Sequence, residues 1–377
     1  MLSFWEAQSF LETDVAIIGG GITGLSVAAS IKERWPNREV TVYERSIFPY
    51  GASTRNAGFA CFGSLTEIIS DIDVMGAEAS RELLFNRWIG LQITRKRLTD
   101  QAIGFEPLGG YELIEARHLE QINRIDEVNI LVQDFIPNYI QELSFDAKIG
   151  LKEKLGTTLV SMQDEGQIDT GLLMKSLEGY VLSLGVKLRT GVRVDQVDPS
   201  ADKFSISMLD QARGRLTIKS NEAIICTNAF VDAMNIDEDV RPGRGQVLIT
   251  KPIDNLQFKG NLHIDEGFFY LRSVGKRLLF GGGRNMDIDR EETTQFELND
   301  DIQSALERKL ANIVALDHPV EVDMRWAGIM AFGASKSPHV KYDQFGRILA
   351  LKMSGMGIAL AGQIGEMVAD LIEDKNA

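Results

Sequence analysis

The sequence predicts an α/β fold of two domains whose segments alternate along the chain. Three observations favour this fold. A strand, a glycine-rich turn, a helix and a second strand follow one another between residues 14 and 44, as in a βαβ unit. Short strands then gather in two blocks, near residues 186–228 and 246–332. The chain has 377 residues, too many for one simple core and enough for two connected domains.

The N-terminal half contains most of the predicted helices. The first, expected over residues 25–35, ends at a tryptophan–proline pair because proline cannot continue a helix. Apolar residues at three- and four-residue spacing predict two long helices, over 80–100 and 116–143. A further helix is expected over 170–184, where Asp169 is a suitable N-terminal cap.

The C-terminal half is richer in strands. The first block is predicted to form short strands at 186–198, 204–209, 215–220 and 222–228. The second block covers 246–282 and 320–332 around a helix near 299–315, and a last helix is expected over 357–373. Because no repeat, low-complexity tract or flexible linker separates the blocks, the two domains are expected to share the chain in alternating segments.

Composition and charge disfavour several classes of function. The net charge of -14 argues against binding to nucleic acid or to an anionic membrane surface. The N-terminus lacks a basic segment followed by an apolar one, so we expect a cytoplasmic protein with no secretory signal and no membrane-spanning segment. Two cysteines and four scattered histidines offer neither a disulfide framework nor the spacing of a metal site.

The segment GGGITG, from Gly19 to Gly24, matches the pattern G-x-G-x-x-G between an apolar strand and a helix, and Glu44 ends the next strand. Gly19 would allow the tight turn, Gly21 the approach of a pyrophosphate, and Gly24 the close packing of helix against strand. The helix N-terminus would face the anion, and Glu44 would accept hydrogen bonds from a ribose diol. The alternative is a glycine-rich turn that binds nothing. The pattern predicts a dinucleotide with an ADP half, which NAD and FAD share.

Four further segments of the chain resemble motifs of the same protein family. They are the small-residue loop 51–58 after Glu44-Arg45, the segment 223–229 (AIICTNA), the segment 241–246 (RPGRGQ) and the loop 353–360 (MSGMGIAL). Together, in order and over nearly the whole chain, they resemble the D-amino-acid oxidase and glycine oxidase superfamily of FAD-dependent oxidoreductases. One departure is Asn228, which replaces the usual glycine of the second segment.

The resemblance implies a Rossmann-like FAD-binding domain of the glutathione-reductase type, interleaved with an α+β substrate domain on a mixed or antiparallel sheet. Residues 1–90, 151–240 and 335–377 would form the first domain, and residues 91–150 and 241–334 the second. A helix that begins near Gly357 would also direct its positive end toward the reduced flavin. The alternative is an ordinary amphipathic helix with a glycine-rich start.

The residues that we expect to bind FAD come from all of these segments. They are Gly19, Gly21, Ile22, Thr23, Gly24, Glu44, Arg45, Ser53, Thr54, Arg55, Asn56, Ala57, Gly58, Val194, Thr227, Gly328, Gly355, Met356, Gly357 and Ile358. For Arg55, a phosphate contact and a solvent-facing position remain equal alternatives. Cys61 follows the loop, but in relatives with covalent flavin the attachment cysteine lies toward the C-terminal half. We therefore expect non-covalent FAD and a buried, unreactive Cys61.

The expected substrate segment departs from the family pattern. Relatives that oxidise amino acids bind the substrate carboxylate with an arginine just after a Trp-Ala-Gly motif, but here Met330 stands near that position. Either the substrate lacks an α-carboxylate beside the oxidised amine, as in oxidases of amines such as γ-glutamylputrescine, or another arginine binds the carboxylate. The candidates for the substrate pocket are Arg272, Arg284, Arg325, Tyr270 and Met330, although each also has an ordinary structural explanation in solvent, an ion pair or the core.

We expect an enzyme that oxidises the C–N bond of a small amine or amino acid by hydride transfer to the flavin N5 atom, with oxygen or another acceptor reoxidising the flavin. Such chemistry depends mainly on positioning and electrostatics, so no catalytic base is assigned. The alternatives are an FAD-dependent dehydrogenase of 2-hydroxy acids, a non-catalytic flavin-binding subunit and a nicotinamide dehydrogenase. The substrate, the electron acceptor and the oligomeric state stay open.

Overall fold

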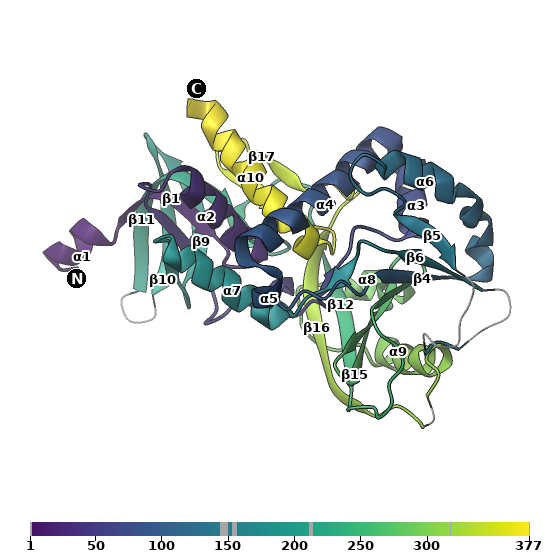
Figure 1. Cartoon of the computed structure of the whole chain (residues 1–377). Helices are drawn as coiled ribbons and strands as arrows, with labels where there is room; N and C mark the ends of the chain where they lie inside the picture. The colour runs from purple at the N-terminus through teal and green to yellow at the C-terminus, as the bar shows by residue number, and fades with distance from the viewer. Residues whose placement is uncertain (1, 144–149, 153–156, 211–213, 317, 377) are drawn as a thin grey trace.

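The structure is a computed structural model that describes residues 2–143, 150–152, 157–210, 214–316 and 318–376 (Figure 1). Within these ranges the strands form two sheets of eight strands each and one further pair of strands. Figure 1 shows the two sheets side by side, with α1 (Phe4–Ser9) projecting beyond the first. The predicted α/β fold with two strand-rich parts is confirmed.

The first sheet is mainly parallel. Its spatial order is β17 (His339–Tyr342), β18 (Ile348–Leu351), β11 (Gly214–Ile225), β1 (Glu12–Ile18), β2 (Val40–Tyr43) and β8 (Lys187–Arg189), while β10 (Lys203–Asp210) and β9 (Arg193–Ser200) continue from β11. The strands from β18 to β8 are parallel, and β17, β10 and β9 pair antiparallel with their neighbours. Parallel strands are buried on both faces, which explains the apolar run in β1.

Both faces of β1 pack against other elements. Val15 and Ile17 belong to the apolar core that includes α2 (Ile22–Arg34), α4 (Ala77–Leu98), α7 (Thr170–Ser183) and α10 (Gly357–Asn376). Ala16 and Ile18 point to the opposite face, toward the core that includes β9 and β10. This alternation follows from the two-residue period of a strand.

The second sheet is largely antiparallel. Its order is β16 (Val322–Phe332), β12 (Arg241–Thr250), β15 (Arg277–Gly282), β14 (Phe269–Val274), β13 (Asn261–Ile264), β4 (Gly110–Ile114), β6 (Thr158–Met162) and β5 (Ile140–Leu143). Only β13 and β4 pair in parallel among these neighbours. The apolar side of α9 (Asp300–Ile313) shares a core with this sheet.

The remaining elements are mostly short. The helices are α3 (Leu65–Met75), α5 (Asp100–Ile103), α6 (Ile125–Val132) and α8 (Ile288–Glu291), the 3-10 turns are η1 (Ala52–Thr54), η2 (Ala116–Arg124), η4 (Asp232–Met234) and η5 (Arg284–Met286), and β3 (Phe59–Ala60) pairs with β7 (Gly166–Gln167).

Most of the predicted elements are present, but the long helix over 116–143 is wrong. That range contains η2, α6 and β5. Pro137 cannot continue a helix, and Asn138 has a φ of 56°, which turns the chain into the strand. The domain boundaries stay a prediction; β6, from the range assigned to the first domain, pairs with β4 and β5 in the second sheet.

Candidate cofactor and substrate site

A cavity of about 860 Å³ lies at the carboxyl ends of the parallel strands and reaches the second sheet. Its lining includes residues at the ends of β1, β2 and β11, where ligands bind in open parallel sheets. The far part of the lining comes from β12, β13, β14 and β16. The volume falls within the range of about 300–1,000 Å³ that is typical of ligand sites.

The glycine turn joins β1 to α2 at one end of this cavity. Gly19 has a φ of 109°, which favours glycine. An added Cβ at Gly24 would lie 1.9 Å from the carbonyl oxygen of Gly19, so the helix can approach the turn only without a side chain there. The backbone N–H of Ile22, in the first turn of α2, points to Ser53 and donates to its Oγ at 3.0 Å. The turn thus presents a helix N-terminus to the cavity, as a pyrophosphate site requires.

Glu44 lies at the end of β2 and is buried. Its two carboxylate oxygens accept hydrogen bonds from the backbone N–H groups of Gly20 and Ser46, each at 3.0 Å. A carboxylate oxygen has more than one lone pair, so each can accept a further bond from a ribose hydroxyl. The two backbone bonds hold the carboxylate in place beside the turn.

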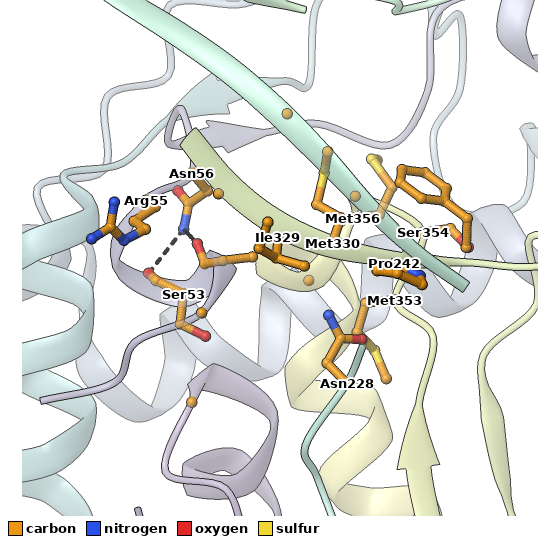
Figure 2. Close-up of a pocket in the computed structure, with 18 of the residues that line it drawn as sticks. Ser53, Arg55, Asn56, Asn228, Pro242, Ile329, Met330, Met353, Ser354 and Met356 are labelled. Carbon is orange, nitrogen blue, oxygen red and sulfur yellow. Dashed lines mark hydrogen bonds between the residues drawn. The ribbon is translucent and has the colours of Figure 1, made fainter. Parts of the chain in front are cut away.

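The loop 51–58 is held in shape by Asn56. Its side-chain amide donates to the carbonyl oxygens of Ala52 and Ser53 at 3.2 and 2.9 Å (Figure 2). Its side-chain carbonyl oxygen accepts from Gly58 N at 2.9 Å and from Thr170 Oγ1 at 2.7 Å. Asn56 therefore uses its hydrogen-bonding groups on the loop itself and on the start of α7.

Arg55 faces the second sheet. Its guanidinium donates to the carbonyl oxygen of Ala327 in β16 at 3.1 Å and lies against the rings of Tyr50 and Phe296. In return, Trp326 Nε1 donates to the backbone oxygen of Arg55 at 2.9 Å. These contacts join the loop to β16, so Arg55 is neither solvent-facing nor committed to a phosphate.

The segment after β11 and the C-terminal loop bring buried polar atoms to the cavity without hydrogen-bond partners among the described residues. Thr227 Oγ1, Asn228 Oδ1 and Ser354 Oγ are buried and accept or donate no hydrogen bond within the described ranges, and all three residues line the cavity. The backbone N–H of Ser354 donates to the carbonyl oxygen of Ala331 in β16 at 3.1 Å, which brings this loop beside Met330; Figure 2 draws Ser354 and Met330 among the residues of the site. Gly357 begins α10 at this point. Unpaired polar groups beside a helix N-terminus suit the polar edge of a flavin.

Tyr270, Arg284 and Met330 line the part of the cavity next to the second sheet. The guanidinium of Arg284 lies 4.0 Å from the ring centre of Phe332, and burial lowers its pKa. Burial raises the pKa of Tyr270 to about 12, so its hydroxyl stays protonated at neutral pH. Neither side chain forms a hydrogen bond in the part of the chain that the structure describes, and the carboxylates of Glu292 and Glu291 act on Arg284 only electrostatically.

The other two arginine candidates lie outside the lining of the cavity. Arg272 is buried and donates from Nη1 to the carbonyl oxygens of Ala57, Gly58 and Ile168, at 3.0, 2.8 and 2.8 Å. Arg325 is bound to α9, through Gln303 Oε1 at 2.8 Å and the Glu307 carboxylate at 2.7 Å. Both guanidinium groups are thus occupied by structural contacts.

A charged cluster in the cavity wall was not anticipated from the sequence. Cys61, Glu67, His263 and Lys336 line the cavity, and His263 Nε2 lies 3.3 Å from Glu165 Oε2. These residues come from α3, β13 and three loops, so no local pattern connects them. Cys61 is buried as expected, and burial raises the pKa of its thiol.

Eighteen of the predicted FAD-binding residues line the cavity, and Gly24 and Thr54 do not. Gly24 lies behind the turn, against Gly19. Thr54 is exposed and donates to the carbonyl oxygen of Pro49 at 2.8 Å. The cavity therefore brings together the glycine turn, the small-residue loop and the C-terminal loop, which lie far apart in the sequence.

A mainly parallel sheet with a dinucleotide turn, joined through one cavity to a largely antiparallel sheet, is typical of two-part dinucleotide-binding proteins. The chain belongs to the FAD dependent oxidoreductase family, DAO, whose pattern matches residues 14–371. FAD is the cofactor of this family, so the resemblance seen in the sequence and the choice of FAD over NAD are confirmed.

Individual proteins agree with this assignment. The chain is 25% identical over 396 residues to the gamma-glutamylputrescine oxidoreductase of Escherichia coli (strain K12), covering 95% of this chain and 83% of that one. Its fold is similar to that of L-proline dehydrogenase from P. horikoshii, with a TM-score of 0.79, 18% identity and coverage of 97% and 94% of the two chains. For glycine oxidase from Geobacillus kaustophilus the TM-score is 0.75, the identity 20% and the coverage 96% and 95%.

Among the described residues, no helix has both the length and the apolar character needed to cross a membrane.

Proposed function

We propose that this FAD-dependent oxidoreductase oxidises the C–N bond of a small amine or amino acid. The observation that carries the proposal is that a cationic group, Arg284, and a neutral donor, Tyr270, line the same cavity beside one strand. An added Cβ at Gly243 in β12 would lie 3.5 Å from Arg284 Cδ, and one at Gly245 would lie 3.8 Å from Tyr270 Oη. Neither group is satisfied by a protein acceptor within the described chain. A guanidinium and a hydroxyl together suit a carboxylate, and the related proteins named above act on amino acids or on an amine.

In this proposal Arg284 binds the substrate carboxylate and Tyr270 donates a second hydrogen bond to it. The ring of Phe332 lies under the guanidinium and limits its movement. Phe59 and Met330 add an apolar wall, which excludes water and strengthens the ionic contact. When bound, FAD accepts the two electrons and the hydrogen removed from the substrate carbon, and the residues of this chain orient that carbon.

The amine end of the substrate would then face the Phe59 side of the pocket, where the ring of Tyr270 lies 5.7 Å from that of Phe59. The missing arginine at Met330 does not prevent carboxylate binding in this arrangement, because Arg284 enters the cavity from the end of β15 instead. An amino acid, or an N-alkylated amino acid, is therefore preferred to an amine without a carboxylate.

The test is anaerobic reduction of the FAD-loaded protein by each compound of a panel. The loss of flavin absorbance measures the reduction. The panel contains glycine, sarcosine, D- and L-proline, putrescine derivatives, lactate and 2-hydroxyglutarate. We expect bleaching by at least one amino acid. Bleaching by 2-hydroxy acids alone would contradict C–N oxidation, and reduction by dithionite but by no compound would favour a non-catalytic flavin-binding subunit.

A further inference from the structure

Cys61, Glu165 and His263 form a compact buried cluster in the wall of the cavity. One atom of each residue lies within 4.8 Å of the others, and His263 Nε2 is 3.3 Å from Glu165 Oε2. The other carboxylate oxygen of Glu165 accepts from Phe62 N at 3.0 Å and from Tyr139 Oη at 2.7 Å. Glu165 is fully buried, whereas Cys61 and His263 line the cavity. Phe62 and Tyr139 thus hold the Glu165 carboxylate through one oxygen, and the His263 ring contacts the other oxygen on the side of the cavity.

The cluster lies beside the proposed substrate pocket. His263 in β13 is the direct cross-strand partner of Tyr270 in β14, and opposite residues of an antiparallel pair project from the same face. The ring of Phe59 stands edge-on to both, with centroids 5.2 Å from His263 and 5.7 Å from Tyr270. His263 therefore belongs to the same wall as the residues assigned to substrate binding.

The charges around His263 come from several elements. Cys61 and Glu165 contact the ring, Glu112 is its parallel cross-strand partner in β4, and Glu67 in α3 acts on it electrostatically. Burial alone would lower the pKa of His263, but the hydrogen bonds with Cys61 and Glu165 raise it well above its usual value.

The other two carboxyl groups, those of Glu67 and Glu112, have partners of their own. Glu67 pairs with Lys336 and Arg87, both at 3.2 Å, and Lys336 also binds Asp71 at 2.7 Å. Glu112 accepts hydrogen bonds from Ser64 and Thr66, and burial raises its pKa to about 7. Glu165 is therefore the carboxylate that stabilises a proton on His263.

We propose that His263 is a permanently protonated residue of the cavity wall, held by Glu165, that places positive charge beside the flavin and the substrate. A fixed cation near a group that gathers negative charge on reduction favours the reduced form. The same charge favours a substrate amine in its neutral form, which is the form that can lose a hydrogen with its electron pair. The effect on the substrate amine rests on the proposed function, whereas the effect on the reduced flavin requires only bound FAD.

The protonation of His263 can be measured directly in the wild-type holoprotein. The chain has four histidines, so ring carbon resonances of ¹³C-labelled histidine can be assigned with single His→Gln variants. We expect the ring of His263 to stay in the imidazolium form between pH 6 and 8, where free histidine loses its proton, at a pKa of about 6.5. A resonance of His263 that titrates near that pKa, or that is neutral throughout, would overturn the proposal.

The effect on the cofactor is tested by the midpoint potential of bound FAD, measured against a reference dye. The His263→Gln variant is expected to shift the two-electron equilibrium at least tenfold toward oxidised FAD, which corresponds to about 30 mV. Glu165→Gln should shift it in the same direction, because it removes the carboxylate that stabilises the imidazolium. His318→Gln, at an exposed position, is the matched control and should leave the potential unchanged.

Equal potentials for wild type and both cluster variants would overturn the inference. Stoichiometric zinc in the purified protein, lost in Cys61→Ser, would also overturn it, since a metal ion would then replace the proton. Neither measurement uses a substrate. A protein that oxidises no amine can therefore still pass this test, and one that does can still fail it.

Discussion

Replacing Arg272 by methionine should loosen the FAD-binding loop rather than remove a substrate contact. Its Nη1 shares two N–H groups among the carbonyl oxygens of Ala57, Gly58 and Ile168, and its Nε donates to the carbonyl oxygen of Ser273 at 3.3 Å. These three charged N–H donors are worth about 1.5–3 kcal/mol each. Against this, burial lowers the pKa of Arg272 from 12.5 to about 10, an opposing cost of about 3 kcal/mol at 1.36 kcal/mol per pH unit. The net loss is therefore about 2–6 kcal/mol in the free energy of unfolding.

The assay is thermal unfolding of the apoprotein and of the FAD-loaded protein. At about 2–4 °C per kcal/mol, Arg272→Met should lower the midpoint of both forms and weaken FAD binding. Arg325→Met is the matched control: its side chain is 30% exposed, and loss of a partly exposed pair costs about 1 kcal/mol or less. Wild-type stability of Arg272→Met together with a loss of substrate affinity would refute this reasoning.

Two further substitutions test the cofactor turn and a buried acid. Gly24→Ala adds a Cβ 1.9 Å from the carbonyl oxygen of Gly19, so the purified protein should carry little flavin absorbance, whereas Gly179→Ala, with open space around its Cβ, should bind FAD normally. Burial raises the pKa of Glu112 to about 7. Between pH 4.5 and 7 the folded state therefore binds more protons than the unfolded state, and the free energy of unfolding falls as the pH rises through that window. Glu112→Gln should remove this loss in urea titrations at pH 5 and pH 8; an unchanged pH dependence would contradict it.

The glycine turn could be predicted because all its determinants are local. Gly19, Gly21 and Gly24 are close in sequence, an apolar run precedes them, and the helix after them ends at a tryptophan–proline pair. The same local reasoning failed over 116–143, where amphipathic spacing continued across Pro137. A proline inside a segment with helical spacing outweighs that spacing, since the backbone cannot continue the helix through it.

The substrate pocket could be predicted only in part. A pattern along one strand indicates which arginines are available, but each guanidinium is positioned by partners that are distant in sequence. Arg272 is held by a carbonyl at Ile168, and Arg325 by Glu307 in α9. Arg284 differs because its guanidinium lies against the ring of Phe332 and is attracted by Glu292 and Glu291, but forms no hydrogen bond within the described ranges. The cluster of Cys61 with His263 depends on Glu165, about one hundred residues away from each, and could not be found from spacing.

The proposal that Arg284 binds a substrate carboxylate beside the flavin is tested most directly by one anaerobic titration. The FAD-loaded wild type, Arg284→Met and Arg325→Met are titrated with the amino acid that bleaches the wild type best. The rate of bleaching is followed at each substrate concentration. Loss of a charge-assisted hydrogen bond of about 1.5–3 kcal/mol predicts that Arg284→Met needs about 10- to 150-fold more substrate to reach half of its maximal bleaching rate, while Arg325→Met matches the wild type. The same substrate dependence of the bleaching rate in wild type and Arg284→Met would contradict the account.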